Sequence, residues 1–416
     1  MEQSIKREIL KNRQIKKFSL YGFLKDLKFF EPYLLIYLMG NGLSLLQIGI
    51  LFAIREIIIN IFEIPSGIIA DCFGRKKELC ICFIFYIISF FFFFLSSTFF
   101  IAVFAMVFFG LGEAFRSGTH KAMIYSYLEE MQWTSYKSFV YGKTRSLSLI
   151  GTALSSILAI FIILNIPSSK YIFLFATVPY ILDFFLIMSY PKSIDMAENS
   201  KKFNIRTMLK LVKTDLINKK DLRKILIGNG LFESVVESIK DFIQPMLEMI
   251  IVGAGLVFFV NITPDKNLKI ILGVVYAVIN IFSSFASRNA YRLKRIGNAS
   301  FLMNGFYISL SVSLLLLGLL FNNSIGICVI FLLIYLIENF RQPIFMEEID
   351  SNMHKNERAT MLSIAEQLKS LFIIILAPTA GWIADTYGMR QVMIALAIML
   401  IVTFPLFMLK QKPKEE

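Results

Sequence analysis

Two Glu-x-x-Arg pairs lie inside long apolar stretches of this sequence. Glu113 and Arg116 occupy one stretch, Glu338 and Arg341 occupy another, and both pairs lie at the same depth from the start of their stretch. If these stretches cross a membrane, the charges must face an aqueous cavity or one another, because an ionised side chain in hydrocarbon is costly. An acid and a base three residues apart could bind a solute, exchange a proton or form a silent ion pair within one helix.

A third apolar stretch carries a row of acidic side chains. Glu233, Glu237 and Asp241 follow one another at intervals of four residues, and the row continues through Gln244 and Glu248. This spacing keeps all five side chains on one face of a helix. Since that face cannot look at lipid, we interpret it as one wall of a water-filled path.

Glu31 is a further intramembrane carboxyl, and Pro32 follows it directly. Proline disturbs the helical geometry around it. A carboxyl at such a place could carry a proton, because removal from water favours its neutral form. It could equally be a structural group that is hydrogen-bonded to a neighbouring helix.

The composition places these charges in a membrane protein. Of the 416 residues 56% are hydrophobic and 42 are Phe, whereas an ordinary soluble domain is roughly 45–50% apolar. Twelve stretches are long enough to cross a hydrocarbon layer of about 30 Å. They lie near 19–40, 45–70, 78–97, 99–125, 143–165, 170–190, 224–250, 267–288, 298–321, 324–346, 359–382 and 391–410. We predict an all-α membrane protein with twelve transmembrane helices.

The net charge is +13. The positive residues are concentrated in the loops of one membrane side, which does not indicate nucleic-acid binding. Segment 191–224 alone holds ten Lys and Arg residues, while the turns of the opposite side hold only Lys170, Lys266 and Arg390. Positive loops stay on the cytoplasmic side, so we expect a multi-pass protein of the cell membrane with both termini in the cytoplasm. We read the first apolar stretch as a retained helix and not as a signal peptide.

The polar segment 191–223 divides the chain into two halves, 1–190 and 224–416, each with six predicted helices. Three features recur in the same order in both halves: the Glu-x-x-Arg pair, a polar entry to the following span ("GKTRSLS", 142–148, and "NERATMLS", 356–363), and a basic loop. Such repeats are common in transporters. We predict two pseudo-symmetric six-helix bundles joined by a cytoplasmic central loop.

The first basic loop, "GIIADCFGRKK" (67–77), resembles the signature loop of the major facilitator superfamily. The residues that match the family's motif are Gly67, Asp71, Gly74, Arg75 and Lys76. The resemblance implies that this loop is a cytoplasmic gate: Gly67 would allow close helix approach, Gly74 a tight turn, and Asp71 a contact with a helix N-terminus or a cation. A similar string, "GWIADTYGMR" (381–390), falls on the other side, and we interpret it as a helix-end turn and not as a second gate.

In the fold that the chain resembles, the first, fourth, seventh and tenth helices line the central cavity. The resemblance therefore implies a substrate or proton pathway built from the intramembrane charges described above. Its members are Glu31, Glu113, Arg116, Glu233, Glu237, Asp241, Glu338 and Arg341.

We expect a secondary active transporter that is coupled to protons and exports a small cationic or amphipathic organic solute by alternating access. One departure favours an alternative: span five reads "SLIGTALSSILAIF" (148–161) and keeps only Gly151 of the glycine pattern of many antiporters. Uptake of a nutrient or an organic anion, held by Arg116 and Arg341, is that alternative. A membrane sensor without transport is a third candidate.

Several classes of activity find no support in the sequence. No nucleotide-binding loop of the type G-x-x-x-x-G-K-[ST] occurs, which argues against direct drive by ATP. No nucleophile–base or metal cluster appears at helical spacing, so we expect no enzyme, no cofactor and no metal site. The expected partners are a small solute, protons and the lipid bilayer, and we expect a monomer.

Overall fold

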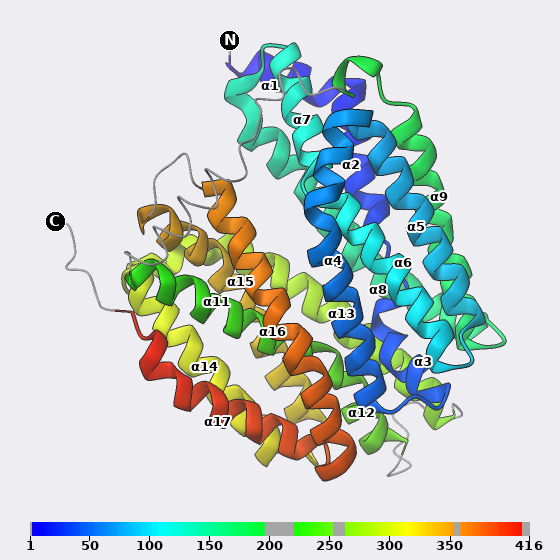
Figure 1. Cartoon of the computed structure of the whole chain (residues 1–416), viewed down its shortest axis with the longest axis vertical. Helices are drawn as coiled ribbons and strands as arrows, with labels where there is room; N and C mark the ends of the chain where they lie inside the picture. The colour runs from blue at the N-terminus through cyan, green and yellow to red at the C-terminus, as the bar shows by residue number, and fades with distance from the viewer. Residues whose placement is uncertain (1, 196–219, 253–262, 353–357, 410–416) are drawn as a thin grey trace. The chain divides into compact units, whose positions relative to one another are not determined.

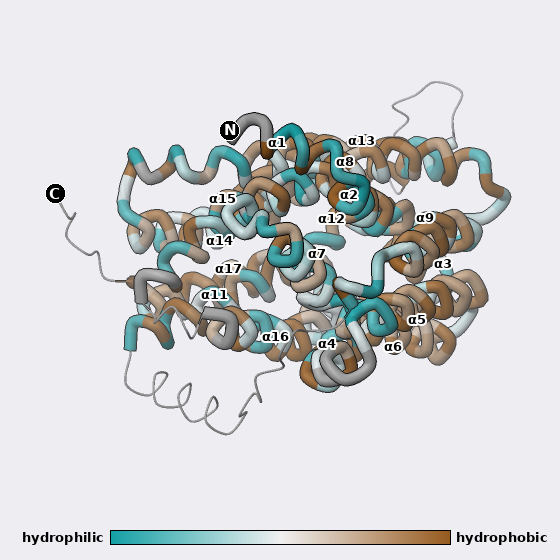
Figure 2. The backbone as a smooth tube through the Cα atoms, turned by 90° about the horizontal axis from the view of Figure 1, so that it is seen from above, coloured by the Kyte–Doolittle hydropathy of each residue, from teal (hydrophilic) through white to brown (hydrophobic). Residues whose placement is uncertain are grey.

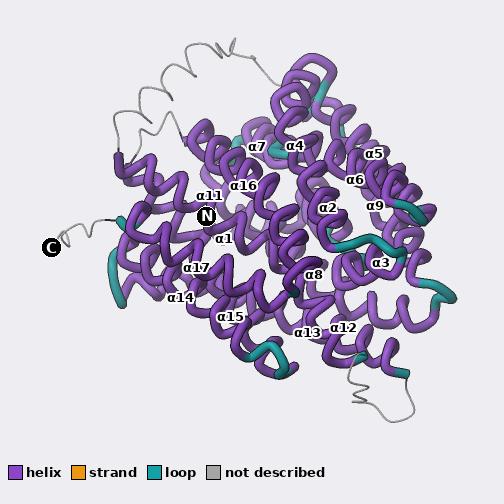
Figure 3. The backbone as a smooth tube through the Cα atoms, turned by 60° about the horizontal axis from the view of Figure 1, so that its bottom comes forward, coloured by secondary structure: helices purple, strands orange, loops and turns teal. Residues whose placement is uncertain are grey.

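The structure is a computed structural model that describes residues 2–195, 220–252, 263–352 and 358–409. All secondary structure in these ranges is helical (Figure 3), which confirms the predicted all-α class. The chain packs as two units: unit 1 contains Met1–Tyr37 and Ile54–Lys201, and unit 2 contains Leu38–Ala53 and Lys202–Glu416. The segment Leu38–Ala53, which the predicted division assigns to the first bundle, thus packs with unit 2. The division into bundles itself stays a prediction.

The first half of the chain forms the helices labelled α1 to α9 in Figure 1. They are α1 (Glu2–Lys11), α2 (Arg13–Lys25), α3 (Leu34–Gly40), α4 (Leu45–Phe73), α5 (Arg75–Leu95), α6 (Phe99–Arg116), α7 (Thr119–Glu130), α8 (Lys137–Asn165) and α9 (Ile172–Met188). Within unit 1, α5 packs on α6 and α9, and α2 packs on α8.

The second half forms α11 (Lys220–Ile239), α12 (Ile243–Ile251), α13 (Pro264–Asn289), α14 (Ala299–Leu319), α15 (Ser324–Asn352), α16 (Arg358–Tyr387) and α17 (Met389–Phe407). Within unit 2, α11 packs on α16, and α14 packs on both α15 and α17. Figure 2 shows that most of these long helices are predominantly hydrophobic.

Ten of the described helical segments are long and apolar enough to cross a membrane. The two predicted spans that do not qualify as one continuous helix are the first and the seventh. Span one consists of α2, an irregular segment, a 3-10 turn at Glu31–Tyr33 and α3; span seven consists of α11, a 3-10 turn at Lys240–Phe242 and α12. Equivalent spans of the two halves are therefore both interrupted.

A proline lies near each interruption, although α2 already ends at Lys25, before Pro32. Pro32 lies inside the 3-10 turn of span one, and Pro245 follows the 3-10 turn of span seven. A proline has no N–H and its ring collides with the carbonyl four residues earlier, so an α-helix cannot run through either place undisturbed. At the first break the hydroxyl of Tyr180 donates a hydrogen bond to the carbonyl of Lys25 at 3.2 Å, which satisfies one freed backbone group.

A close helix crossing holds α2 against α8 in unit 1. A Cβ atom on Gly151 would lie 2.5 Å from the backbone oxygen of Phe23, so only glycine fits there. The hydroxyl of Ser148, one turn earlier, donates to the backbone oxygen of Gly22 at 3.1 Å. Small residues permit such contacts between membrane helices, and Gly151 therefore has a packing role.

We expect Gly151→Ala to destabilise the protein by about 1–3 kcal/mol, the usual cost of overpacking. Gly142→Ala is the matched control, because Gly142 lies in the same helix and its Cβ would meet open space. Thermal unfolding of both variants in the same detergent measures the difference. Equal melting temperatures would show that α2 can move away from α8 without cost.

Candidate functional site

Seven charged side chains gather in unit 2 on α11, on the 3-10 turn that follows it, and on α15 and α16, and we call them the charged cluster. Lys240 pairs with Glu237 at 2.8 Å, Lys369 pairs with Glu366 at 2.5 Å, and Arg341 lies 3.6 Å from Glu233. Glu338 lies within the electrostatic reach of Glu233, Glu237, Lys240 and Lys369. The members of the cluster are Glu233, Glu237, Lys240, Glu338, Arg341, Glu366 and Lys369.

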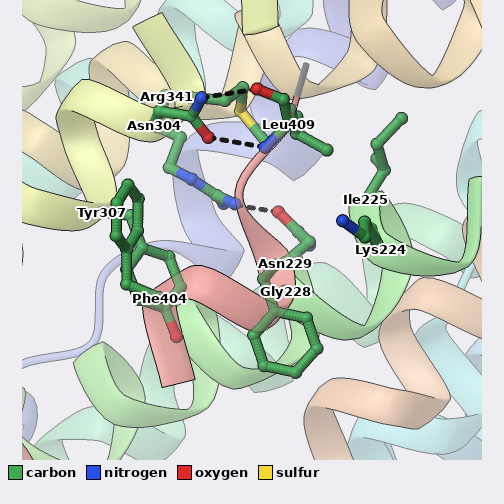
Figure 4. A pocket seen from close by; sticks show the side chains of 11 residues that line it. Lys224, Ile225, Gly228, Asn229, Asn304, Tyr307, Arg341, Phe404 and Leu409 are labelled. Atoms are coloured by element: carbon green, nitrogen blue, oxygen red, sulfur yellow. Dashed lines mark hydrogen bonds between the residues drawn. The ribbon is translucent and has the colours of Figure 1, made fainter. Parts of the chain in front are cut away.

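Arg341 is the most deeply buried of these charges, with 2% of its surface exposed. Its Nη1 donates to Oδ1 of Asn229 at 2.5 Å (Figure 4), and its guanidinium lies 4.0 Å above the ring of Phe232. Charge–ring contacts of this kind stabilise a cation most where water is excluded. The Nε atom of Arg341 has no hydrogen-bond partner within the described residues, so one donor is left to bind something else.

The pair Glu338–Arg341 is thus not an intrahelical ion pair in this structure. Arg341 turns to Asn229 and Glu233 on α11. Glu338 is half-buried and has no hydrogen bond or ion pair among the residues that the structure describes. The sequence left open that Glu338 and Arg341 form an ion pair with no further role. The structure does not show that ion pair.

A pocket opens beside Arg341 between α11, α14 and α17. Its free space is about 280 Å³, part of which is open to the surroundings. Asn229, Asn304 and Lys224 supply polar groups, while Tyr307 and Phe404 supply aromatic walls (Figure 4). No carboxylate is among the residues that line it, so its two charges, those of Lys224 and Arg341, are both positive.

The acidic row on span seven is interrupted by a 3-10 turn, and its two parts have different partners. The Tyr276 hydroxyl of α13 donates to Asp241 at 3.1 Å and receives a hydrogen bond from the amide of Gln244 at 3.0 Å. Glu233 and Glu237, by contrast, belong to the charged cluster. The 3-10 turn at Lys240–Phe242 changes the helical phase between these two groups, which the even spacing in the sequence did not indicate.

The corresponding pair in unit 1, Glu113 and Arg116, does form an intrahelical ion pair. Arg116 forms an ion pair with Glu113 one turn earlier on α6. Its Nε donates to the hydroxyl of Tyr86 on α5 at 3.1 Å. The two Glu-x-x-Arg pairs therefore differ: one is closed within its helix, and the other is open.

Sequence reasoning missed three charges at the break of span one. Lys25 and Asp26 form an ion pair at 2.9 Å, Asp26 also accepts a hydrogen bond from Ser148, and the charge of Lys28 acts on Glu113. The signal was the string "KDLK" (25–28) inside a predicted span. Glu31 begins the 3-10 turn that follows, so the interrupted part of span one carries four charges between residues 25 and 31.

Lys240 and Lys369 were missed in unit 2. Lys240 and Asp241 stand at the break of span seven as Lys25 and Asp26 stand at the break of span one. This repeated Lys-Asp pair was visible in the sequence. Interrupted helices that expose polar groups are a common way to build binding sites in transporters.

Asp183 on α9 is another buried acid. Its side chain is fully buried, and neither carboxylate oxygen has a hydrogen-bond partner within the described residues. Lys25 and Asp26 are the charges that act on it most strongly. An unpaired carboxylate in such surroundings is costly. Asp183 thus feels the charges at the break of span one but takes no part in the ion pair of Lys25 and Asp26.

The signature loop is tied down by contacts within unit 1. Gly74 has φ +99°, which favours glycine, and it lies directly against the carboxylate of Asp195. Arg75 donates to Ser126 at 2.7 Å, and the Nζ of Lys76 donates to the backbone oxygen of Tyr190 at 3.0 Å.

Asp195 was not predicted as part of this loop. Its side chain accepts from the backbone N–H of Lys76 at 2.7 Å, and its backbone oxygen accepts from the N–H of Arg75 at 3.0 Å. These bonds cap the start of α5. A Cβ on Gly67 would meet open space within the described residues, so no close helix contact is seen at this glycine. The side chain of Asp71 lies outside the described residues.

The described residues do not meet the requirements of a metal site. Within the described ranges, no three His, Cys, Asp or Glu side chains lie together in a way that could hold a metal ion. Ion pairs and hydrogen bonds account for most of the polar contacts described above.

Comparisons with known proteins agree with this architecture. The model of the family described as Major Facilitator Superfamily matches residues 26–368. An uncharacterized MFS-type transporter of Bacillus subtilis (strain 168), YxaM, is 24% identical over 409 residues, which cover 93% of this chain and 92% of that protein.

Solved structures show the same fold. The crystal structure of the nucleoside transporter NupG has a TM-score of 0.76 at 14% identity and covers 95% of this chain and 98% of its own. A bacterial homologue of the human lysosomal transporter Spinster, inward-facing and unoccupied, has a TM-score of 0.73 at 13% identity, with 95% of both chains covered. The twelve spans, the match to the family model and the shared fold lead to one conclusion: the chain is a membrane transporter that belongs to the Major Facilitator Superfamily.

Proposed function

We propose that this transporter is coupled to protons and exports a small cationic or amphipathic organic solute by alternating access. It would act in the cell membrane, with both termini in the cytoplasm, as a monomer. The charged cluster is the observation that carries this proposal. Its four carboxylates exceed its three basic groups, so the cluster can accept a positive charge, either from protons or from a solute.

Glu338 is the best candidate for the group that exchanges the proton. It is half-buried on α15 and has no bonded partner among the described residues. Two carboxylates, Glu233 and Glu237, act on it, and two lysines of the charged cluster act in the opposite sense. Neighbouring like charges favour binding of a proton. A cationic solute that enters the cluster would compete with that proton, which is the basis of exchange.

The ion pair of Glu113 and Arg116 in unit 1 would supply the second step of the transport cycle. While Arg116 holds Glu113, this carboxylate is neutralised and cannot bind a proton or a solute. If the pair opens during the cycle, Glu113 becomes available at a depth equivalent to that of Glu338. Two equivalent acids that become available in turn would suit a mechanism in which two halves alternate.

Uptake of an organic anion is the alternative, and the pocket beside Arg341 favours it. That pocket has two positive side chains, two amides and aromatic walls, and no carboxylate among its lining residues. Arginine is well suited to bind carboxylate or phosphate groups through paired hydrogen bonds. The names of the solved neighbours include nucleoside, peptide and Spinster transporters, which supports a small organic solute without choosing its charge.

A flux measurement decides between the two. The purified protein is reconstituted in vesicles, a pH gradient is imposed, and cationic and anionic compounds are screened for movement. Movement of cations against the proton gradient supports export by exchange. Movement of anions in the same direction as protons supports anion uptake. Flux that does not depend on the pH gradient contradicts both proton-coupled export and proton-coupled uptake.

We expect Glu338→Gln to abolish flux that depends on the pH gradient, because the amide cannot exchange a proton. Exchange of labelled for unlabelled solute without a gradient should continue. Glu129→Gln is the control, since Glu129 pairs with Lys137 in an exposed position. If Glu338→Gln keeps its full proton dependence, another group carries the proton.

Arg341→Lys separates the two proposed solutes. Lysine keeps the positive charge but lacks the planar guanidinium that contacts Asn229 and stacks on Phe232. Anion uptake should fall by roughly 10-fold or more, which corresponds to about 1.4 kcal/mol of lost binding, whereas cation export should change little. Arg116→Lys serves as the matched comparison, and equal effects of both substitutions on anion uptake would exclude a special role of the pocket beside Arg341.

A further inference from the structure

The string "GWIADTYGMR" at the end of α16 repeats the signature loop more closely than a helix-end turn requires. Gly381, Asp385 and Gly388 stand at the same spacing as Gly67, Asp71 and Gly74. Gly388 has φ +97°, where Gly74 has φ +99°. Both glycines directly precede the next helix, α17 in one case and α5 in the other.

Asp385 binds the start of α4. Its Oδ1 accepts from the backbone N–H of Leu45 at 3.0 Å, and its Oδ2 accepts from the N–H of Leu46 at 2.8 Å. Both contacts lie within unit 2, which contains Leu38–Ala53. A carboxylate at the N-terminus of a helix is favoured both by hydrogen bonds to free N–H groups and by the helix dipole.

The rest of this helix start is satisfied locally. Ser44 accepts from the N–H of Gln47 at 3.3 Å, and the side chain of Gln47 accepts from the N–H of Ser44 at 3.0 Å, which is a capping box. Asp385 therefore supplies the bonds that the local sequence does not. The cap of α4 is complete only while α16 stays in contact with it.

Two glycines allow this contact. A Cβ on Gly381 would lie 2.2 Å from the backbone oxygen of Leu45, and a Cβ on Gly49 would lie 2.3 Å from that of Ala377. Each helix thus presents a glycine to the backbone of the other. Any side chain at either position would push α4 and α16 apart.

We propose that Asp385, Gly381 and Gly49 form a second latch, which holds the ends of α4 and α16 together on the outer side of the membrane. The signature loop is the C-terminal end of α4, and Asp385 binds its N-terminal end. The two related strings therefore act at opposite ends of one helix, and on opposite membrane faces. This proposal rests on the proposed function, transport by alternating access. It makes the string at 381–390 part of a gate, whereas we interpreted it from the sequence as a helix-end turn.

The latch acts on a helix that runs through both units. α4 belongs to unit 2 up to Ala53 and to unit 1 from Ile54 onward. A change in the relation between the units must therefore bend α4 or separate its first turns from α16. Release of the Asp385 cap is the step that permits the second outcome.

The test measures the distance between spin labels at Gly40→Cys and Tyr387→Cys, in a background whose four native cysteines are replaced by alanine. Gly40 has open space around it and Tyr387 is exposed. Asp385→Ala should raise the population of long distances by roughly 5- to 30-fold, which corresponds to the loss of one helix cap. Asp265→Ala is the control, because Asp265 is also an acid near a helix start but pairs with Lys269 of its own helix.

Two further variants protect this test against misfolding. Asp385→Asn keeps the size and one acceptor oxygen but loses the charge, and it should give an intermediate distribution. Gly381→Val should also favour long distances, while Gly305→Val, at a position with open space, should not. A distance distribution unchanged in both Asp385→Asn and Gly381→Val would overturn the latch, whereas loss of proton coupling in other variants would leave it intact.

Discussion

The cost of placing charge in hydrocarbon governs this structure. More than a dozen ionisable side chains lie within the spans, and each needs a partner, a cavity or a bound proton. The described structure meets this need in different ways in its two units. In unit 1 Arg116 is neutralised within its own helix by Glu113. In unit 2 Arg341 is surrounded by Asn229, Glu233 and the face of Phe232, and Glu338 has no hydrogen bond or ion pair within the part of the chain that the structure describes.

The interrupted first and seventh spans follow from the same constraint. A continuous helix satisfies all its backbone groups and offers none to a solute, so it cannot by itself create a polar site. A proline lies near each break, Pro32 and Pro245, and each break carries a Lys-Asp pair. The side chains of Tyr180, Ser148 and Tyr276 then satisfy the groups that the breaks expose. Equivalent positions in the two halves thus carry the same device.

The fold was predictable because it depends on long apolar runs and on a repeated order of motifs. The depth of the Glu-x-x-Arg pairs and the match at Gly67–Lys76 led to the right family. The detailed site was less accessible, because hydrogen bonds between distant segments leave no spacing pattern. Asp195 lies far along the chain from Lys76, and nothing in "PKSID" (191–195) indicates that it caps α5. The even spacing of the acids in span seven did not reveal the 3-10 turn at Lys240–Phe242, which separates Glu233 and Glu237 from Gln244 and Glu248.

The way in which α4 is shared has a consequence for dividing this protein into pieces. A polypeptide that ended before the central polar segment would contain all of α4 but none of α16, so the N–H groups of Leu45 and Leu46 would lose their acceptor and Gly49 its neighbour. The N-terminal half is thus not self-sufficient at this helix end. Two separately produced halves would each present an unfinished surface, and mutual recognition through α4 would bring them together.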